Sequence, residues 1–254
     1  MEKTIYGMTI LIWGCQNSSN KPINNPKIDI NSIELIDTFK NKLLLDTANS
    51  ITIAEFHPTY IGVAKNSILL NYWSDEIEYR TMDWQEYKDP DSNDLEIYVD
   101  TSQIIGSVNK FSISLPPPPL NYENDPKEID NEEDKQEKKN YRGEIKSYPV
   151  FVKNKTKDTL DVGYGEYIPL IIEAKDNSGN WKPIQKPYIY RCGTGLTNYF
   201  LPPNEIIITS CKLFEGDYET KMRVTFGFDN TTSSNEFKGK MNYKQFDESK
   251  EKYY

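Results

Sequence analysis

Hydrophobic and polar residues alternate in short runs over much of the chain. Between residues 28 and 115 these runs are rich in β-branched and aromatic residues, and Asn, Asp, Pro or Gly bounds each of them. A period of two, interrupted by turn residues, is typical of β-strands with one buried face. The stretch 32–45 fits a helical face and a strand equally well, so the pattern leaves it open. The predicted strands of this region are 51–56, 60–63, 67–73, 76–80 and 95–99.

The same pattern resumes after residue 145. Asp, Asn and Gly at 176–180 suit a turn between two strands, because these residues tolerate left-handed backbone angles. Strands at this spacing over about 100 residues are typical of a β-sandwich. The sequence therefore predicts a mainly β chain, in which an immunoglobulin-like β-sandwich at 145–246 follows a smaller strand-rich region at 28–115. The predicted strands of the sandwich are 148–152, 159–162, 167–175, 181–184, 205–214, 219–228 and 235–242.

A Pro-rich and acidic segment separates the two regions. Four consecutive prolines occupy 116–119, and the stretch 121–140 has eight acidic residues, four Lys and one aliphatic residue. Such a stretch buries too little apolar area to offset its ordering entropy. We therefore expect a linker or long exposed loop at 116–144, which contains a large part of the net charge of -9, and a charged tail at 247–254.

The first residues of the chain indicate its destination. An apolar run at 5–13 follows Lys3 and ends at Gly14 and Cys15. It is shorter than the roughly 20 residues that cross a bilayer, and it is typical of a secretory signal. The alternative is a buried first strand with an incidental Cys. The polar stretch that follows, rich in Asn, Ser and Pro, favours a signal at 1–14 and a tether at 15–27.

The sequence Ile12-Trp13-Gly14-Cys15 resembles the lipobox of bacterial lipoproteins, in which the Cys is acylated and becomes the mature N-terminus. This resemblance implies that Cys15 anchors the chain in a membrane. Surface lipoproteins of the Bacteroidota type often carry acidic residues directly after the Cys, and residues 16–20 carry none. The resemblance therefore favours an outer membrane lipoprotein of the bacterial cell envelope that faces the periplasm.

A second resemblance concerns the C-terminal region. Residues 201–205 and the stretch from Gly216 to Arg223 resemble the latter half of immunoglobulin-like domains, and Tyr218 resembles their tyrosine-corner residue. Together with residues 234–239, the region is similar to uncharacterised lipoproteins of Bacteroidota. The resemblance implies a fold and a location, but no activity. The Cys that antibody-type domains place two positions after this tyrosine is replaced by Thr220.

The three cysteines divide into an anchor and a pair. With Cys15 acylated, Cys192 and Cys211 remain in an oxidising compartment. A structural disulfide between them would contribute about 3 kcal/mol in the chain-entropy description. The alternative is two separate buried thiols. The spacing does not match a catalytic dithiol, which would need a Cys-x-x-Cys motif.

Catalytic and metal-binding patterns are sparse. The single His, His57, excludes His-rich zinc sites and schemes that need two histidines, and no Gly-x-Ser-x-Gly motif is present. The loop 89–94 resembles the start of a calcium loop, but it lacks the Gly at position six and the Glu at position twelve, so a plain turn is favoured. The sequence predicts no catalytic residue, no metal site and no cofactor.

Aromatic residues provide the candidate binding positions. Trp73, Tyr79, Trp84 and Tyr87 lie close together among acidic residues. Aromatic side chains on an exposed sheet face can bind sugars or peptides, and the alternative is cross-strand packing. The net charge of -9 argues against a nucleic-acid partner.

These observations favour a lipid-anchored, non-enzymatic envelope protein that binds an unknown protein or glycan partner. Two other functions stay open. One is an envelope hydrolase that uses a carboxylate pair, because acidic pairs are abundant. The other is a periplasmic immunity or inhibitor protein.

Overall fold

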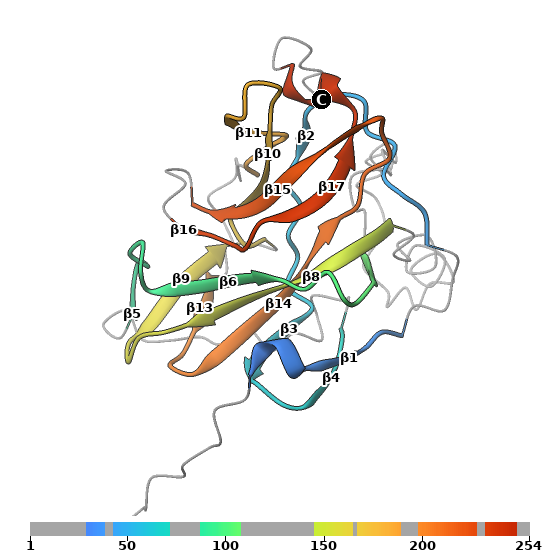
Figure 1. Ribbon diagram of the computed structural model, residues 1–254. Coiled ribbons are helices and arrows are strands. Elements are labelled where there is room, and N and C mark those ends of the chain that lie inside the picture. The colour runs from blue at the N-terminus through green and yellow to red at the C-terminus, as the bar shows by residue number, and fades with distance from the viewer. Residues whose placement is uncertain are drawn as a thin grey trace, which may run out of the picture.

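The computed structural model describes residues 29–38, 43–71, 87–107, 145–164, 167–188, 198–227 and 232–247. Within these ranges the chain consists mainly of β-strands, with two short 3-10 helices (Figure 1). The strands form several sheets that pack face to face, so the prediction of a mainly β, sandwich-like fold is confirmed. None of the helices in the described ranges has the length and apolar character needed to cross a membrane.

An antiparallel sheet lies at the centre of the molecule, and we call it the central sheet. Its strand order is β3-β14-β8-β6, and β7 pairs with the first part of β8. The two long strands, β8 and β14, run side by side over seven residue pairs. The strands are β3 (Tyr60–Val63), β6 (Leu95–Val99), β7 (Ile105–Ser107), β8 (Ile145–Asn154) and β14 (Glu205–Lys212).

A second antiparallel sheet packs on one face of the central sheet. Its order is β11-β10-β15-β16, and β17 also pairs with β15. Apolar residues at alternate positions of the two sheets, such as Ile172 and Val224 facing Val152 and Ile207, form the larger hydrophobic core. The strands of this second sheet are β10 (Leu170–Lys175), β11 (Trp181–Pro183), β15 (Tyr218–Phe226), β16 (Thr232–Ser233) and β17 (Phe237–Met241).

A third layer covers the other face of the central sheet. It contains the 3-10 helix η1 (Ile30–Ser32) and a parallel pair of strands, β1 (Glu34–Ile36) and β4 (Ser67–Leu69). Their apolar residues form the smaller core with residues that point out of the opposite side of β8 and β14. This core contains Ile30, Ile33, Ile68, Leu70, Ile105, Phe151, Ile206 and Ile208.

The burial of β14 follows from this three-layer arrangement. All eight of its residues are buried, and three consecutive isoleucines, Ile206–Ile208, stand where a half-buried strand would alternate apolar and polar residues. A strand covered on both faces has no solvent-facing side, so it lacks the period of two that marks half-buried strands. The β14 sequence therefore specifies the middle position that it occupies.

Shorter strands complete the molecule. β2 (Thr52–Ile53) pairs in parallel with β12 (Gln185–Lys186). β9 (Thr159–Tyr164) lies between β5 (Tyr87–Lys88) and β13 (Asn198–Leu201). The second 3-10 helix, η3 (Tyr243–Phe246), begins with a capping box formed by Asn242 and Gln245.

The sheets combine strands from both regions that the sequence separates. β3 and β6 come from region 28–115, and they pair directly with β14 and β8 from region 145–246. Residues of both regions also share the larger core. The sequence left open whether 28–115 folds alone. In the structure it does not form a separate unit, because its strands complete the central sheet. The predicted linker 116–144, the signal 1–14 and the tether 15–27 lie outside the described residues.

Several local predictions can be compared with the structure. The strands predicted at 60–63 and 95–99 are β3 and β6 with the same bounds, whereas the strand predicted at 51–56 is reduced to β2. The open stretch 32–45 is extended where it is described, with β1 and an isolated bridge at Leu44. At 176–180 the predicted turn is present, and the Asp176 carboxylate accepts hydrogen bonds from the backbone N–H groups of Ser178 and Asn180.

Tyr218 differs from the residue that it resembles. A tyrosine-corner hydroxyl bonds to the backbone a few residues upstream. The Tyr218 hydroxyl instead donates to the carbonyl oxygen of Lys175, 43 positions earlier, at a distance of 2.9 Å. Thr220 donates to the same oxygen at 2.8 Å. These two bonds tie the start of β15 to the end of β10.

A buried ion pair lies on the third-layer side of the central sheet. Lys212, at the end of β14, donates to the carboxylate of Glu55, and their side chains are only 8% and 4% exposed. Removing one partner of a buried ion pair leaves the other charge uncompensated in a medium of low polarity. This pair therefore links the segment before β3 to the central strand.

Lys212→Met should lower the free energy of unfolding by about 3–5 kcal/mol, because it leaves the Glu55 carboxylate buried without its cation. The measurement is urea unfolding followed by circular dichroism. Lys221→Met is the matched control: it removes the exposed ion pair between Lys221 and Glu236, and we expect almost no change in the midpoint. Equal destabilisation by both variants would contradict this account of the pair.

Candidate binding surface

Of the four candidate aromatic residues, the structure describes Tyr87. Tyr87 lies on β5, and its ring packs against Phe200 of β13 with 4.7 Å between centroids. This contact is the cross-strand packing that the sequence offered as the alternative. Trp73, Tyr79 and Trp84 lie outside the described residues.

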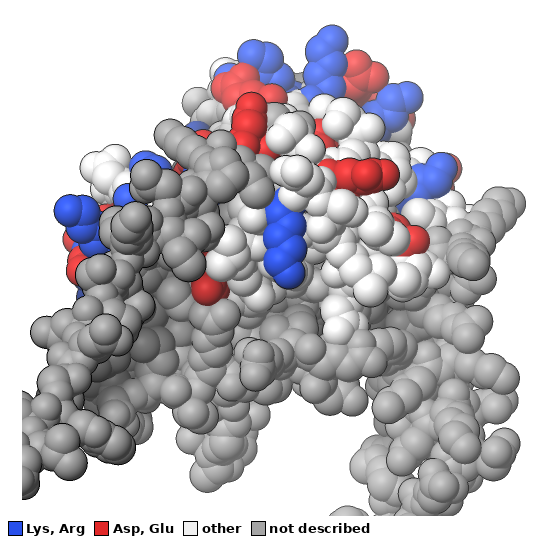
Figure 2. Space-filling model, turned by 90° about the horizontal axis from the view of Figure 1, so that it is seen from below, with Lys and Arg blue, Asp and Glu red and all other residues white. Residues whose placement is uncertain are grey.

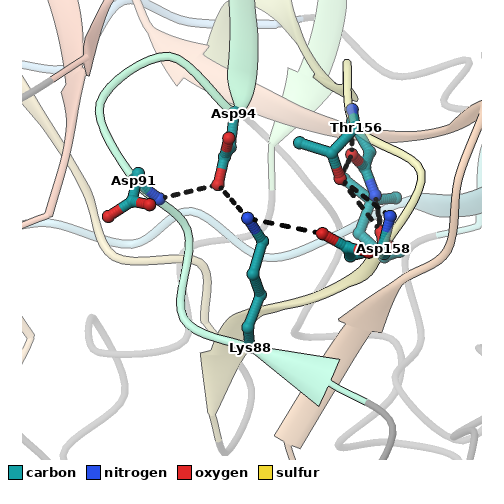
Figure 3. Close-up of polar contacts among 7 residues, drawn as sticks. Lys88, Asp91, Asp94, Thr156 and Asp158 are labelled. Atoms are coloured by element: carbon teal, nitrogen blue, oxygen red, sulfur yellow. Dashed lines mark hydrogen bonds and ion pairs between the residues drawn. The ribbon is translucent and has the colours of Figure 1, made fainter.

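The loop that resembles a calcium site is a turn held by a lysine. The Asp94 carboxylate accepts a hydrogen bond from the backbone N–H of Asp91 at 3.0 Å, and Lys88 lies 3.0 Å from it (Figure 3). Lys88 also lies 3.5 Å from Asp158, on the neighbouring turn before β9. The backbone bond and then the lysine lower the pKa of Asp94 from its usual value. In the described ranges, His, Cys, Asp and Glu form no group of three that could hold a metal ion.

His57 belongs to a stack of aromatic rings. Its ring lies 4.4 Å from that of Tyr167, which in turn lies 4.0 Å from Tyr188. The hydroxyl of Tyr164 donates to the Tyr188 carbonyl at 3.2 Å, and the His57 carbonyl accepts from Thr209 at 2.6 Å. These contacts give His57 a packing role at the end of the segment that leads into β3.

The predicted Cys192–Cys211 disulfide is not formed in the structure. Cys211 is a free thiol on β14, only 1% exposed. Its side chain faces the larger core between the two main sheets, and this burial raises the pKa of the thiol well above its usual value. The prediction rested on an even number of cysteines, and counting cannot show that one of them faces a closed core. Cys15 and Cys192 lie outside the described residues.

The outer face of the second sheet is its most distinctive surface. Along β10, Ile172 and Ala174 point into the core, so Glu173 and Lys175 lie on the other side of the sheet, where Glu173 is buried and Lys175 is partly exposed. In β17, a side chain at Gly239 would collide with the sulfur atom of buried Met222, so this position faces inward. We call this outer surface the Trp181 face. Its residues are Glu173, Lys175, Trp181, Glu219, Lys221, Arg223, Glu236, Lys238 and Lys240.

Trp181 holds two cations of this face. The Arg223 guanidinium lies 4.4 Å from the centre of the indole ring, and the Lys175 ammonium lies 4.8 Å from it. Such contacts between a cation and an aromatic ring are worth about 0.5–1 kcal/mol at exposed sites. Nε of Arg223 also donates to Glu173 at 2.7 Å. The ring is half-buried, and its neighbours are arranged in advance of any ligand.

Glu236 is the acidic residue that two lysines share. It lies 2.7 Å from the ammonium group of Lys221 and 3.6 Å from that of Lys175. The hydrogen bond from Lys221, followed by the charge of Lys175, lowers the pKa of Glu236. Lys238 and Lys240 are exposed on β17 and have no ion-pair partner in the described part of the chain.

The Trp181 face carries five basic and three acidic residues, whereas the whole chain has a net charge of -9. The second sheet lies at the end of the molecule opposite to η1, β1 and β4 (Figure 1). From below, at that opposite end, the described surface is largely uncharged, with most charged side chains along its rim (Figure 2). The exposed cross-strand pair Ile36 and Leu69 belongs to this third layer. The two ends therefore differ in charge.

The comparisons with known proteins gave no relatives. No protein-family description, no curated protein sequence and no solved structure matches this chain.

Sequence reasoning missed the Trp181 face. It identified Trp181 only as part of a predicted strand and examined the aromatic residues before position 100 instead. The signal was the alternation of Lys or Arg with apolar residues in 221–226 and 237–241. That pattern showed which side chains face solvent, but the pairing of β11, β10, β15 and β17 was needed to bring them to one surface.

Iodoacetamide should leave Cys211 unmodified in the native protein, because the thiolate that reacts is disfavoured and the sulfur atom is enclosed. After unfolding in guanidinium without a reducing agent, Cys211 should be alkylated completely. Peptide mapping by mass spectrometry measures both states. A peptide in which Cys211 is linked to Cys192 would show that the bridge forms after all.

Proposed function

We propose that this chain is a lipid-anchored, non-enzymatic protein of the bacterial cell envelope that binds a protein or glycan partner through the Trp181 face. The anchor part of the proposal rests on Ile12-Trp13-Gly14-Cys15 and the polar stretch that follows. The binding part rests on the structure. Two of its cations already contact the Trp181 ring, and further cations are exposed on β15 and β17 of the same face.

The observation that carries the proposal is the organised, solvent-facing character of this sheet face. The central sheet is covered by the third layer on one side and by the second sheet on the other. The outer face of the second sheet keeps Lys221 58% and Lys175 30% exposed. An aromatic ring between cations combines an apolar surface with polar groups, which is the combination found at interfaces.

The position of the tether agrees with this assignment. The described chain begins at Asp29, directly before η1 in the third layer. The predicted tether 15–27 reaches at most about 3.6 Å per residue, or roughly 45 Å. With Cys15 acylated at the outer membrane, a tether of this length leaves the Trp181 face free to meet a partner in the periplasm.

Cys15→Ser should abolish acylation and release the protein from the membrane fraction, because no other anchor is proposed. Mass analysis of the N-terminal peptide and fractionation measure the two effects, and globomycin treatment of the wild type should block its processing. A wild-type protein that is soluble and processed in the same way with globomycin would disprove the anchor.

Trp181→Ala should weaken partner binding about tenfold or more, because it removes the apolar surface and the ring that positions Lys175 and Arg223. A panel of neutral and acidic polysaccharides tests glycan partners by biolayer interferometry. A photoreactive side chain at Lys221 tests protein partners by crosslinking in cells. The matched control is Tyr87→Ala, which alters an aromatic residue of the first region. Loss of binding in this control but not in Trp181→Ala would move the site away from the Trp181 face.

A further inference from the structure

We infer that the partner of the Trp181 face is an acidic polysaccharide. This inference rests on the proposed function and names the chemical class of the ligand. It is carried by the charge distribution of β10, β15 and β17, by two ammonium groups on β17 without an ion-pair partner among the described residues, and by Trp181, which lies on the same face on β11, three strands from β17.

The register of the second sheet brings one pair of like charges together, whereas Glu173 lies opposite Arg223 and Glu219 lies opposite Lys240. Lys221 of β15 lies directly opposite Lys238 of β17. Like charges in directly opposite positions destabilise a sheet. Glu236 binds Lys221 and Lys175, which leaves Lys238 without a partner among the described residues. An anion bound across these two strands would relieve this repulsion, so the arrangement favours a negatively charged ligand.

The free cations form a row. Lys238 and Lys240 are two positions apart on β17, so their side chains lie on the same face at a spacing of about 7 Å. β17 pairs only with β15, so it forms an edge of the described sheet. Lysine ammonium groups are compact charges on flexible stems, and they adjust to carboxylate or sulfate groups without demanding one geometry. A row of this kind suits a polymer that carries repeated negative charges.

Trp181 adds a second kind of contact. Sugar rings have apolar faces, and the Trp181 ring, which is half-buried against Arg223 and Lys175, keeps part of its apolar surface exposed to them. Arg223 and Lys175 lie within 5 Å of the same ring, so an acidic group of a sugar seated there would meet a cation. The combination of a flat ring with adjacent cations distinguishes an acidic sugar from a simple inorganic anion.

The test uses the full-length acylated protein in detergent. Polygalacturonate is the acidic probe, and neutral galactan is the matched probe without charge. Binding to polygalacturonate should weaken about tenfold or more between about 50 mM and 500 mM NaCl, because salt screens exposed charges. Galactan should bind much more weakly at every salt concentration.

Lys238→Glu/Lys240→Glu should weaken polygalacturonate binding about tenfold or more. The control is Lys65→Glu/Lys157→Glu, which makes the same change in net charge at exposed lysines outside the second sheet and should keep the wild-type affinity. Circular dichroism of each variant establishes that the fold is retained. Equal losses in both double variants would overturn the inference, since they would show a general effect of net charge.

Other outcomes separate this inference from the proposed function. Equal binding of galactan and polygalacturonate, lost in Trp181→Ala, would overturn the acidic ligand and support a glycan-binding face. Binding to phosphatidylglycerol vesicles but not to polygalacturonate would overturn the inference in favour of a lipid surface. No binding to either polysaccharide would also overturn it, and crosslinking at Lys221 would then decide the proposed function independently.

Discussion

The structure depends on the pairing of β8 with β14. This ladder forms the middle of the central sheet, and side chains from its two faces contribute to both hydrophobic cores. On one side Val152 and Ile207 meet the second sheet, and on the other Phe151 and Ile208 meet the third layer. Neither outer layer contacts the other core, so each is stabilised through this pair. At the end of β14, the buried ion pair between Lys212 and Glu55 adds a polar contact. It connects the strand to a segment that is distant in the sequence.

The same arrangement determines which surfaces are available for recognition. A sheet with two neighbours has no free face, so the proposed binding surface lies on an outer layer. Along the strands of the second sheet, core residues alternate with charged residues. In β10, for example, Ile172 points into the core and Lys175 points to the other side. Its outer side thus acquires a positive character while the chain as a whole is acidic. The third layer, where the described chain begins, exposes apolar residues such as Leu69 instead.

Much of the strand content could be predicted, whereas the relation between strands could not. β3 and β6 were found with their bounds because a period of two and flanking turn residues are local signals. Pairing between β3 and β14 joins residues almost 150 positions apart, and no local pattern encodes it. For this reason the sequence left open how its two strand-rich regions are arranged relative to each other. The Cys211 prediction failed, because cysteine number says nothing about which side of a strand faces the core. The Trp181 face required three strand pairings before its cations came together.

The separation between β3 and β14 has a consequence for biogenesis. Thr59 donates to the Ile208 carbonyl across 149 positions, so the central sheet closes only after β14, Glu205–Lys212, is present. Proteins dominated by such distant pairings fold slowly, because loop closure precedes the stabilising contacts. During most of its translation, the emerging chain would lack β14 and could not complete either hydrophobic core. For a protein exported through a narrow channel, delayed folding is an advantage, since the chain stays threadable until it has crossed.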